Sequence, residues 1–167
     1  HPESYYSFMH RNLFSHVDIK EENVHIPCSE GDDLQKLCKE YNDMLNKATI
    51  DIQLLGIGAN GHIGFNEPGI AFEKETHCVN LSSQTIKANM RFFADEKEVP
   101  RQAYTMGIKT IMSAHKILVI VSGEDKAEIL KKAFFGPITP AVPASVLQLH
   151  NDVTVVADEA ALKEVDL

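Results

Sequence analysis

A histidine and a glutamate with glycines on either side are the residues best suited to chemistry. His62 and Glu67 lie five residues apart in the stretch GIGANGHIGFNEPG, which covers residues 56–69. Glycines let the backbone approach a ligand closely, and a histidine pKa of about 6.5 suits proton transfer at neutral pH. A histidine beside an apolar strand is more often structural, but its position at a strand end, near a carboxylate, favours chemistry here. We predict that His62 moves a proton and that Glu67 holds the imidazole ring.

Alternating helices and strands must position this loop. The hydrophobic pattern predicts helices at residues 3–14, 34–45, 83–93, 124–134 and after 157, and strands at 50–55, 76–81, 104–106, 116–121 and 153–157. Such alternation is typical of an α/β fold with an open, mainly parallel sheet. Because ligands bind at the carboxyl ends of the strands in such sheets, we expect the site just after Leu55 and Val121.

Composition excludes several classes of protein. The 167 residues, 44% of them hydrophobic, fit one ordinary globular domain spanning residues 1–167. With 16 basic and 24 acidic residues the net charge is −8, which argues against a nucleic-acid partner. The longest apolar run is too short to span a membrane. The three cysteines, Cys28, Cys38 and Cys78, form no zinc or disulfide pattern, and we expect reduced thiols in a cytoplasmic protein.

Two alternative functions of the glycine-rich loop fit the sequence poorly. Residues 56–61 match the spacing of the dinucleotide-binding fingerprint, but that fingerprint also needs a helix at its third glycine and an acid about 20 residues later. Residues 62–69 contain too many helix breakers, and no Asp or Glu occurs between Thr76 and Ala94. A metal site is also disfavoured, because His62 and Glu67 have no evident third ligand. We expect neither a redox cofactor nor a metal.

The same loop closely resembles the glucosamine-6-phosphate deaminase family. Four further segments resemble that family in the same order, at residues 1–9, 89–93, 122–127 and 145–150. The resemblance implies a Rossmann-like α/β sandwich whose sheet lies between helices. It also implies a small sugar phosphate as substrate: glucosamine 6-phosphate is converted to fructose 6-phosphate and ammonia, with no cofactor or metal.

The resemblance also assigns roles within the loop. His62 would handle the ring-oxygen proton when the pyranose opens, and Glu67 would orient the imidazole and relay charge to it. Many family members carry an aspartate where this chain has Asn60. An amide can orient its neighbour although it cannot ionise, so we expect Asn60→Asp to leave turnover within about tenfold.

Further residues are assigned to the substrate by the same resemblance. Arg91 and Lys126 align with the cations that bind the phosphate, and the chemistry agrees. A guanidinium offers phosphate two hydrogen bonds, while a lysine near a helix start adds a point charge. Gly56 would line the sugar, and Tyr5 would lie near the site.

Two features of the family have no counterpart in this chain. The family's phosphate loop and proton-abstracting aspartate precede the segment that begins here, so we expect an inactive C-terminal portion of a deaminase. Its sheet would then lack strands on the N-terminal side and expose apolar edges, unless a separate chain completes it.

The effector site of the family is also poorly matched: residues 69–71 are Gly-Ile-Ala, and His77 and Val79 stand where cations are expected. We expect a non-allosteric enzyme, either a monomer or a homo-oligomer.

Two rival functions are kept open. The related 6-phosphogluconolactonases also place a Gly-His pair after a strand, but typically continue differently from residues 63–68 of this chain. A catalytically silent sugar-phosphate-binding module is the second rival, and binding without turnover would distinguish it.

Overall fold

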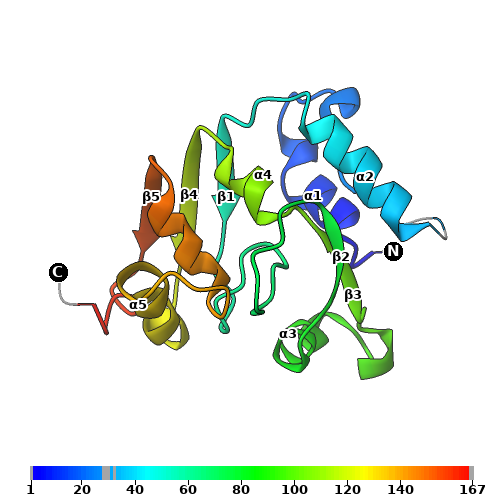
Figure 1. Cartoon of the computed structure of the whole chain (residues 1–167). Coiled ribbons are helices and arrows are strands. Elements are labelled where there is room, and N and C mark those ends of the chain that lie inside the picture. The colour runs from blue at the N-terminus through cyan, green and yellow to red at the C-terminus, as the bar shows by residue number, and fades with distance from the viewer. Residues whose placement is uncertain (1, 28–30, 32, 166–167) are drawn as a thin grey trace.

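A three-stranded parallel sheet forms the centre of the computed structural model, which describes residues 2–27, 31 and 33–165. The strands β1 (Ile52–Leu55), β4 (Lys116–Val121) and β5 (Val153–Ala157) lie in the order β1-β4-β5. Leu55 pairs with Val119, and Val119 with Val155. All three strands therefore end at the same edge of the sheet, the lower edge in Figure 1. The predicted α/β class with a mainly parallel sheet is confirmed.

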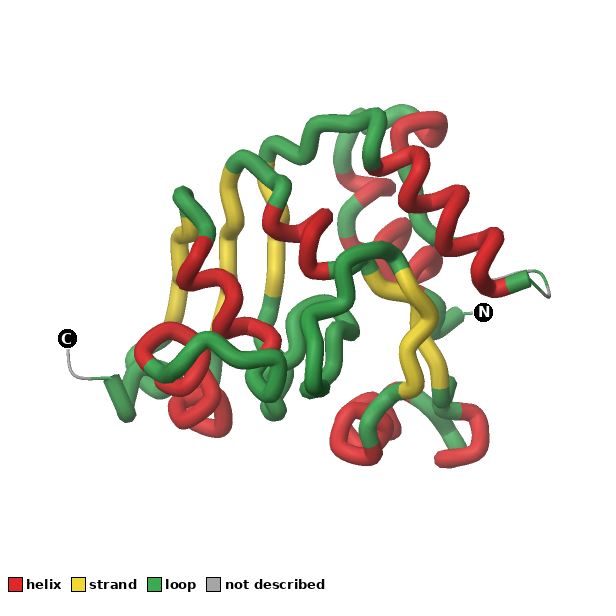
Figure 2. The backbone as a smooth tube through the Cα atoms, viewed as in Figure 1, coloured by secondary structure: helices red, strands yellow, loops and turns green. Residues whose placement is uncertain are grey.

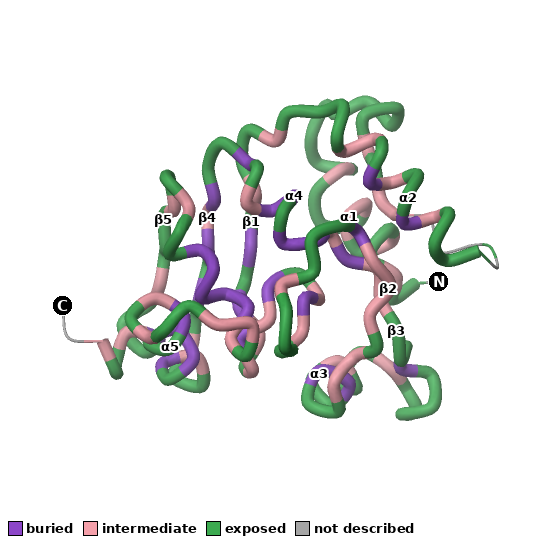
Figure 3. Tube along the Cα trace, viewed as in Figure 1, coloured by how far each residue is buried: buried purple, intermediate pink, exposed green. Residues whose placement is uncertain are grey.

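One face of this sheet carries the hydrophobic core. Ile117 and Val119 are fully buried among side chains of α4 (Ile108–Met112), α5 (Ala127–Phe135) and the 3-10 helix Pro143–Leu149. The purple segments of Figure 3 follow this packing. Alternate side chains point to the other face, where four apolar residues are more than a third exposed. These are Ile52, Leu54, Ile120 and Val156.

A second, antiparallel sheet stands beside the first. It pairs β2 (His77–Asn80) with β3 (Gln102–Thr105), and neither strand joins the parallel sheet. Between these strands lie α3 (Ser83–Asn89) and the 3-10 helices Met90–Phe92 and Glu96–Glu98. The predicted helix over residues 83–93 therefore ends earlier, as α3, and the predicted strand over 104–106 begins at Gln102. In Figure 2 the long loop between β1 and β2 occupies the region between the two sheets.

The N-terminal helices are capped as their sequences favour. α1 (Tyr5–Asn12) begins after Ser4, whose hydroxyl accepts from the Ser7 N–H, and α2 (Leu34–Leu45) begins after Asp33, whose carboxylate accepts from the Lys36 N–H. Short 3-10 helices follow at Phe14–His16, Glu21–Asn23 and, after β4, Glu124–Lys126. A side-chain cap supplies an acceptor to an N–H that has none in the helix, which fixes where each helix starts.

Some sequence predictions differ from the structure at the ends of the chain. Residues 158–165 form turns instead of the predicted C-terminal helix. Cys38 and Cys78 are free thiols, while Cys28 and residue 1 lie outside the described residues. None of the described helices has the length and apolar character needed to cross a bilayer.

Candidate active site

The site begins with a tight turn directly after β1. The Gly58 N–H donates to the His62 carbonyl at 2.9 Å, and the Gly61 N–H donates to the Gly58 carbonyl at 2.8 Å. Gly61 has a φ of +89°, in the region that favours glycine. The turn folds His62 back over Gly58, where a Cβ would overlap the imidazole ring. Glycine at position 58 therefore leaves the space that the ring occupies.

Asn60 connects the histidine to the glutamate. Its Oδ1 lies 2.7 Å from His62 Nδ1, and its Nδ2 donates to Glu67 Oε2 at 2.6 Å. The direct distance between His62 Nδ1 and Glu67 Oε2 is 3.8 Å. Because an amide oxygen only accepts, His62 must donate from Nδ1. In the neutral ring the lone pair is then on Nε2, the atom free to receive a proton.

Two residues at the start of α3 also bind Glu67. The Thr85 hydroxyl donates to Glu67 Oε1 at 2.5 Å, and the Ser82 N–H donates to the same oxygen at 3.3 Å. The Glu67 side chain is only 9% exposed. Burial by itself raises the pKa of this carboxyl, but hydrogen bonds from Thr85, Asn60 and Ser82 bring the pKa below its usual value. Glu67 is therefore a buried, ionised carboxylate.

The pKa of His62 is shifted in the direction that keeps the ring neutral. Burial lowers it most, the charge of Glu67 partly opposes that effect, and the charge of Lys126 lowers it further. Lys126 ends the 3-10 helix after β4 and is 23% exposed, with its Nζ 4.0 Å from Asp125 Oδ2. The ring is therefore a base at neutral pH, with a positive charge close enough to affect it.

Arg91 lies apart from this group. It belongs to the exposed 3-10 helix after α3, and its guanidinium stands 4.8 Å from the centroid of the Phe92 ring. Within the described residues, no hydrogen bond or ion pair joins Arg91 to another predicted site residue. The structure thus joins His62, Asn60 and Glu67 by direct contacts, lets the charge of Lys126 act on His62, and leaves Arg91 on a neighbouring segment.

The remaining predicted residues flank the turn. A Cβ at Gly56 would have Ile120 O as its nearest neighbour, at 3.8 Å, which is an ordinary van der Waals contact, so a methyl group would fit at this position. The Tyr5 ring packs edge-on against Phe65, with centroids 5.9 Å apart, and the Phe65 ring lies 6.3 Å from that of His62. Tyr5 is therefore one aromatic ring away from the imidazole.

Four residues of this site were not predicted from sequence: Gly58, Phe65, Ser82 and Thr85. The glycine-rich string is visible in the sequence, but it does not indicate which residues contact His62 or Glu67. That contact depends on β2 bringing α3 back to the loop.

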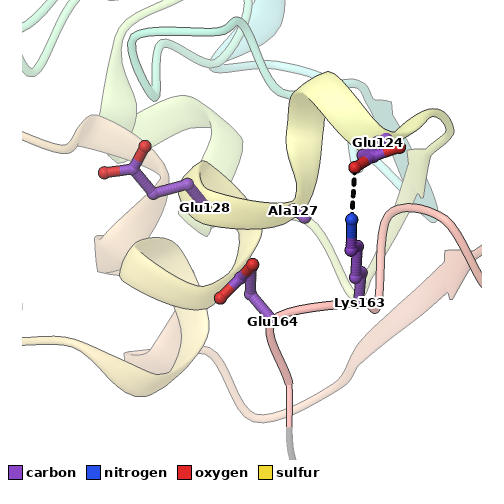
Figure 4. Close-up of a pocket in the computed structure, with 5 residues that line it drawn as sticks. All are labelled: Glu124, Ala127, Glu128, Lys163 and Glu164. Atoms are coloured by element: carbon purple, nitrogen blue, oxygen red, sulfur yellow. Dashed lines mark hydrogen bonds and ion pairs between the residues drawn. The ribbon is translucent and has the colours of Figure 1, made fainter.

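Two open cavities lie elsewhere. The larger, of about 310 Å³, is lined by Glu124, Ala127, Glu128, Lys163 and Glu164, with an ion pair between Lys163 and Glu124 (Figure 4). The second, of about 280 Å³, is lined by Met112, Ala114, His115, Leu149, His150 and Asn151. Carboxylates dominate the first, which makes it unsuited to a phosphate. Among the residues described, no three His, Cys, Asp or Glu side chains are grouped as a metal would require.

Comparison with known proteins shows the family to which the chain belongs. A family model described as "Glucosamine-6-phosphate isomerases/6-phosphogluconolactonase" matches residues 1–156. The chain belongs to this family. A relative from Lachnoclostridium phytofermentans named glucosamine-6-phosphate deaminase is 56% identical over 92% of the chain and 66% of its own length. One from Clostridium botulinum strain Loch Maree, of the same name, is 50% identical over 99% of the chain and 68% of its own length.

Solved structures separate the two branches of the family. A monomeric glucosamine-6-phosphate deaminase superposes with a TM-score of 0.95 at 46% identity, covering 98% of this chain and 68% of that one. A 6-phosphogluconolactonase from Trypanosoma cruzi has a TM-score of 0.74 at 18% identity, covering 100% of this chain and 68% of that one; this likeness is one of fold alone. The chain spans about two thirds of the length of these family members.

Proposed function

We propose that the protein converts glucosamine 6-phosphate and water to fructose 6-phosphate and ammonia. The observation that carries this proposal is the orientation of His62, whose Nδ1 is bound through Asn60 to the ionised Glu67. Identity of 50% or more to relatives named glucosamine-6-phosphate deaminase supports the choice of substrate.

The first chemical step suits a neutral imidazole. We assign to His62 Nε2 the removal of the proton from the hydroxyl on C1 and its return to the ring oxygen. The C1–O5 bond then breaks and a carbonyl forms at C1, with no net change in protons. Glu67 stabilises the imidazolium that exists between the two transfers, and positioned groups of this kind contribute about 10² to 10⁴ in rate.

The later steps need a further base. Isomerisation moves a proton from C2 to C1 and another from the nitrogen to the oxygen on C1, which leaves an imine at C2. Water then hydrolyses this imine to the ketone and releases ammonia. We assign the base for the C2 proton to no residue of this chain. We therefore expect the 167 residues on their own to be inactive, and the active site to be completed by residues outside them.

Lys126 and Arg91 are the groups that we assign to the phosphate. Lys126 precedes α5, so its charge adds to the positive end of that helix. Its charge also lowers the pKa of His62, which supports a role for Lys126 on the side of the site where the reaction occurs. Arg91 supplies a fork of donors suited to phosphate oxygens from the α3 side. Gly56 would leave room for the sugar between them.

The decisive assay is ammonia release from glucosamine 6-phosphate, with hydrolysis of 6-phosphogluconolactone measured in parallel. Both are run on the 167-residue chain and on the chain with any residues that its gene encodes before residue 1. Ammonia release by the longer form alone is the expected result. Two results would contradict the proposed function: lactone hydrolysis in place of ammonia release, or a longer form that binds the sugar phosphate and does not turn it over.

We also propose that the enzyme is cytoplasmic and non-allosteric, and that it acts as a monomer. Saturation curves with and without N-acetylglucosamine 6-phosphate, the effector of regulated family members, test the absence of regulation. Light scattering tests the oligomeric state. Sigmoidal kinetics that the effector makes hyperbolic contradict the absence of regulation.

A further inference from the structure

Thr85 joins α3 to the proton-transfer group through a hydrogen bond with a fixed direction. Its hydroxyl has a single proton, and Glu67 Oε1, 2.5 Å away, can only accept it. The Ser82 hydroxyl, 2.9 Å from that of Thr85, must then donate to Thr85, while the Thr85 N–H donates to Ser82 Oγ. Thr85 is 4% exposed. The proton of this buried hydroxyl is thus donated to the Glu67 carboxylate, which in turn is linked to His62.

We propose that Thr85 is a positioning residue that links the phosphate-binding side of the site to the acid–base pair, an inference that rests on the proposed function. The segment from Ser82 to Phe92 would hold Glu67 at its first turn and the substrate phosphate at Arg91.

Two of the three donors to Glu67 come from this segment. Asn60 belongs to the same loop as Glu67, whereas Thr85 and the Ser82 N–H come from the start of α3. A carboxylate buried without such donors has a raised pKa and becomes protonated more readily. The position of α3 therefore determines whether Glu67 stays ionised and can stabilise a protonated His62.

The same segment carries the second phosphate cation. Arg91 follows Thr85 by six residues, about 9 Å along a helix, and α3 runs directly into the 3-10 helix Met90–Phe92. A phosphate bound at Arg91 restrains this short segment and thereby the hydroxyl on Glu67. A substrate that lacks phosphate would not restrain this segment.

A purely structural role makes a different prediction. The α3 cap uses the Ser82 hydroxyl and the Thr85 N–H, and both remain in Thr85→Val. That variant keeps the branched shape and removes only the hydroxyl, whereas Thr85→Ser restores it. Thr110→Val, at a buried threonine of α4, is the matched control for placing valine in the core.

The first experiment titrates the Glu67 carboxyl by ¹³C NMR and does not depend on turnover. The charge of His62 affects the pKa of Glu67, and the charge of Lys126 affects that of His62. All three variants retain both residues. We expect Thr85→Val to raise the pKa of Glu67, with Thr85→Ser and Thr110→Val close to wild type. An unchanged pKa in Thr85→Val overturns the proposal.

The second experiment measures ammonia release by the longer form of the enzyme, the chain with any residues that its gene encodes before residue 1. We expect Thr85→Val to lower kcat by about 10- to 100-fold, less than the roughly 10² to 10⁴ that a positioned acid–base group itself contributes, and Thr85→Ser to recover most of it. In a double-mutant cycle with Arg91→Met, the effects on kcat/KM should be non-additive by threefold or more. Additive effects, or a serine variant as slow as the valine variant, overturn the link. If the wild-type enzyme releases no ammonia, the proposed function fails, and the titration still tests the role of Thr85.

Discussion

The loop at residues 56–67 and the α3 segment opposite it are anchored in different ways. The loop is bonded to the core, since Ala144 N–H donates to the Gly61 carbonyl at 2.9 Å and Phe65 N–H to Thr105 Oγ1 at 3.0 Å. Ile63, in the middle of the loop, is fully buried. The α3 segment buries its first turn and exposes its end, where Arg91 lies. The group that moves protons is thus held by the core, while a cation proposed for the phosphate lies on a lightly anchored segment.

The largest effect should come from the histidine of the loop. We expect His62→Gln to lower kcat for ammonia release by a factor of about 10² to 10⁴, because the substitution removes the base and leaves the fold intact. His115→Gln, at an exposed histidine, is the control and should behave as wild type. A fall of less than tenfold in His62→Gln, with an unchanged melting temperature, contradicts the assignment.

A pair of glycine variants tests how closely the ring must be held. Gly58→Ala places a methyl group where the imidazole lies, so the ring must move and kcat should fall about 10- to 100-fold. Gly56→Ala meets no atom closer than Ile120 O at 3.8 Å, so it should raise KM if that glycine lines the sugar and leave stability nearly unchanged. Equal kcat values for the two variants would show that ring position is not critical.

The two cations should differ in their effect on pH dependence. Lys126→Met and Arg91→Met should each raise KM by about 10- to 100-fold, the value of a hydrogen bond to a charged group. The charge of Lys126 lowers the pKa of His62, so its removal should raise that pKa and move the acid limb of kcat/KM to higher pH. Arg91→Met should leave the limb in place. A limb that moves equally in both variants contradicts the separate placement of the two cations.

The smallest effect is expected at the bridging amide. Asn60→Asp keeps an acceptor for His62 Nδ1 but loses the donor to Glu67, and the added negative charge offsets part of that loss by stabilising the imidazolium. Turnover at the pH optimum should stay within about tenfold, or roughly 1.4 kcal/mol of barrier. A hundredfold change in either direction means that the amide does more than orient the ring.

The sequence predicted best those features that depend on neighbouring residues. The strand at 116–121 is a continuous apolar run, and the helix at 34–45 has a clear apolar stripe, so both are found where expected. The five-residue helix α4 and the 3-10 helix Pro143–Leu149 are too short to produce such a pattern. The pairing of β2 with β3 depends on contacts across more than 20 residues, which periodicity does not report.

The site follows the same division. His62 and Glu67 were predicted because a histidine and a carboxylate share one glycine-rich loop at a strand end. The contact of Thr85 with Glu67 spans 18 residues and requires α3 to return to the loop. Neither residue type nor spacing reveals such a contact before the chain is folded.

A ¹⁵N NMR titration of His62 tests the central claim, that this imidazole is a neutral base with its proton on Nδ1. The account predicts the Nδ1–H tautomer at pH 7, with Nε2 unprotonated, and protonation only below about pH 6.5, the ordinary value for histidine. An Nε2–H tautomer, or a ring already charged at pH 7, would contradict it.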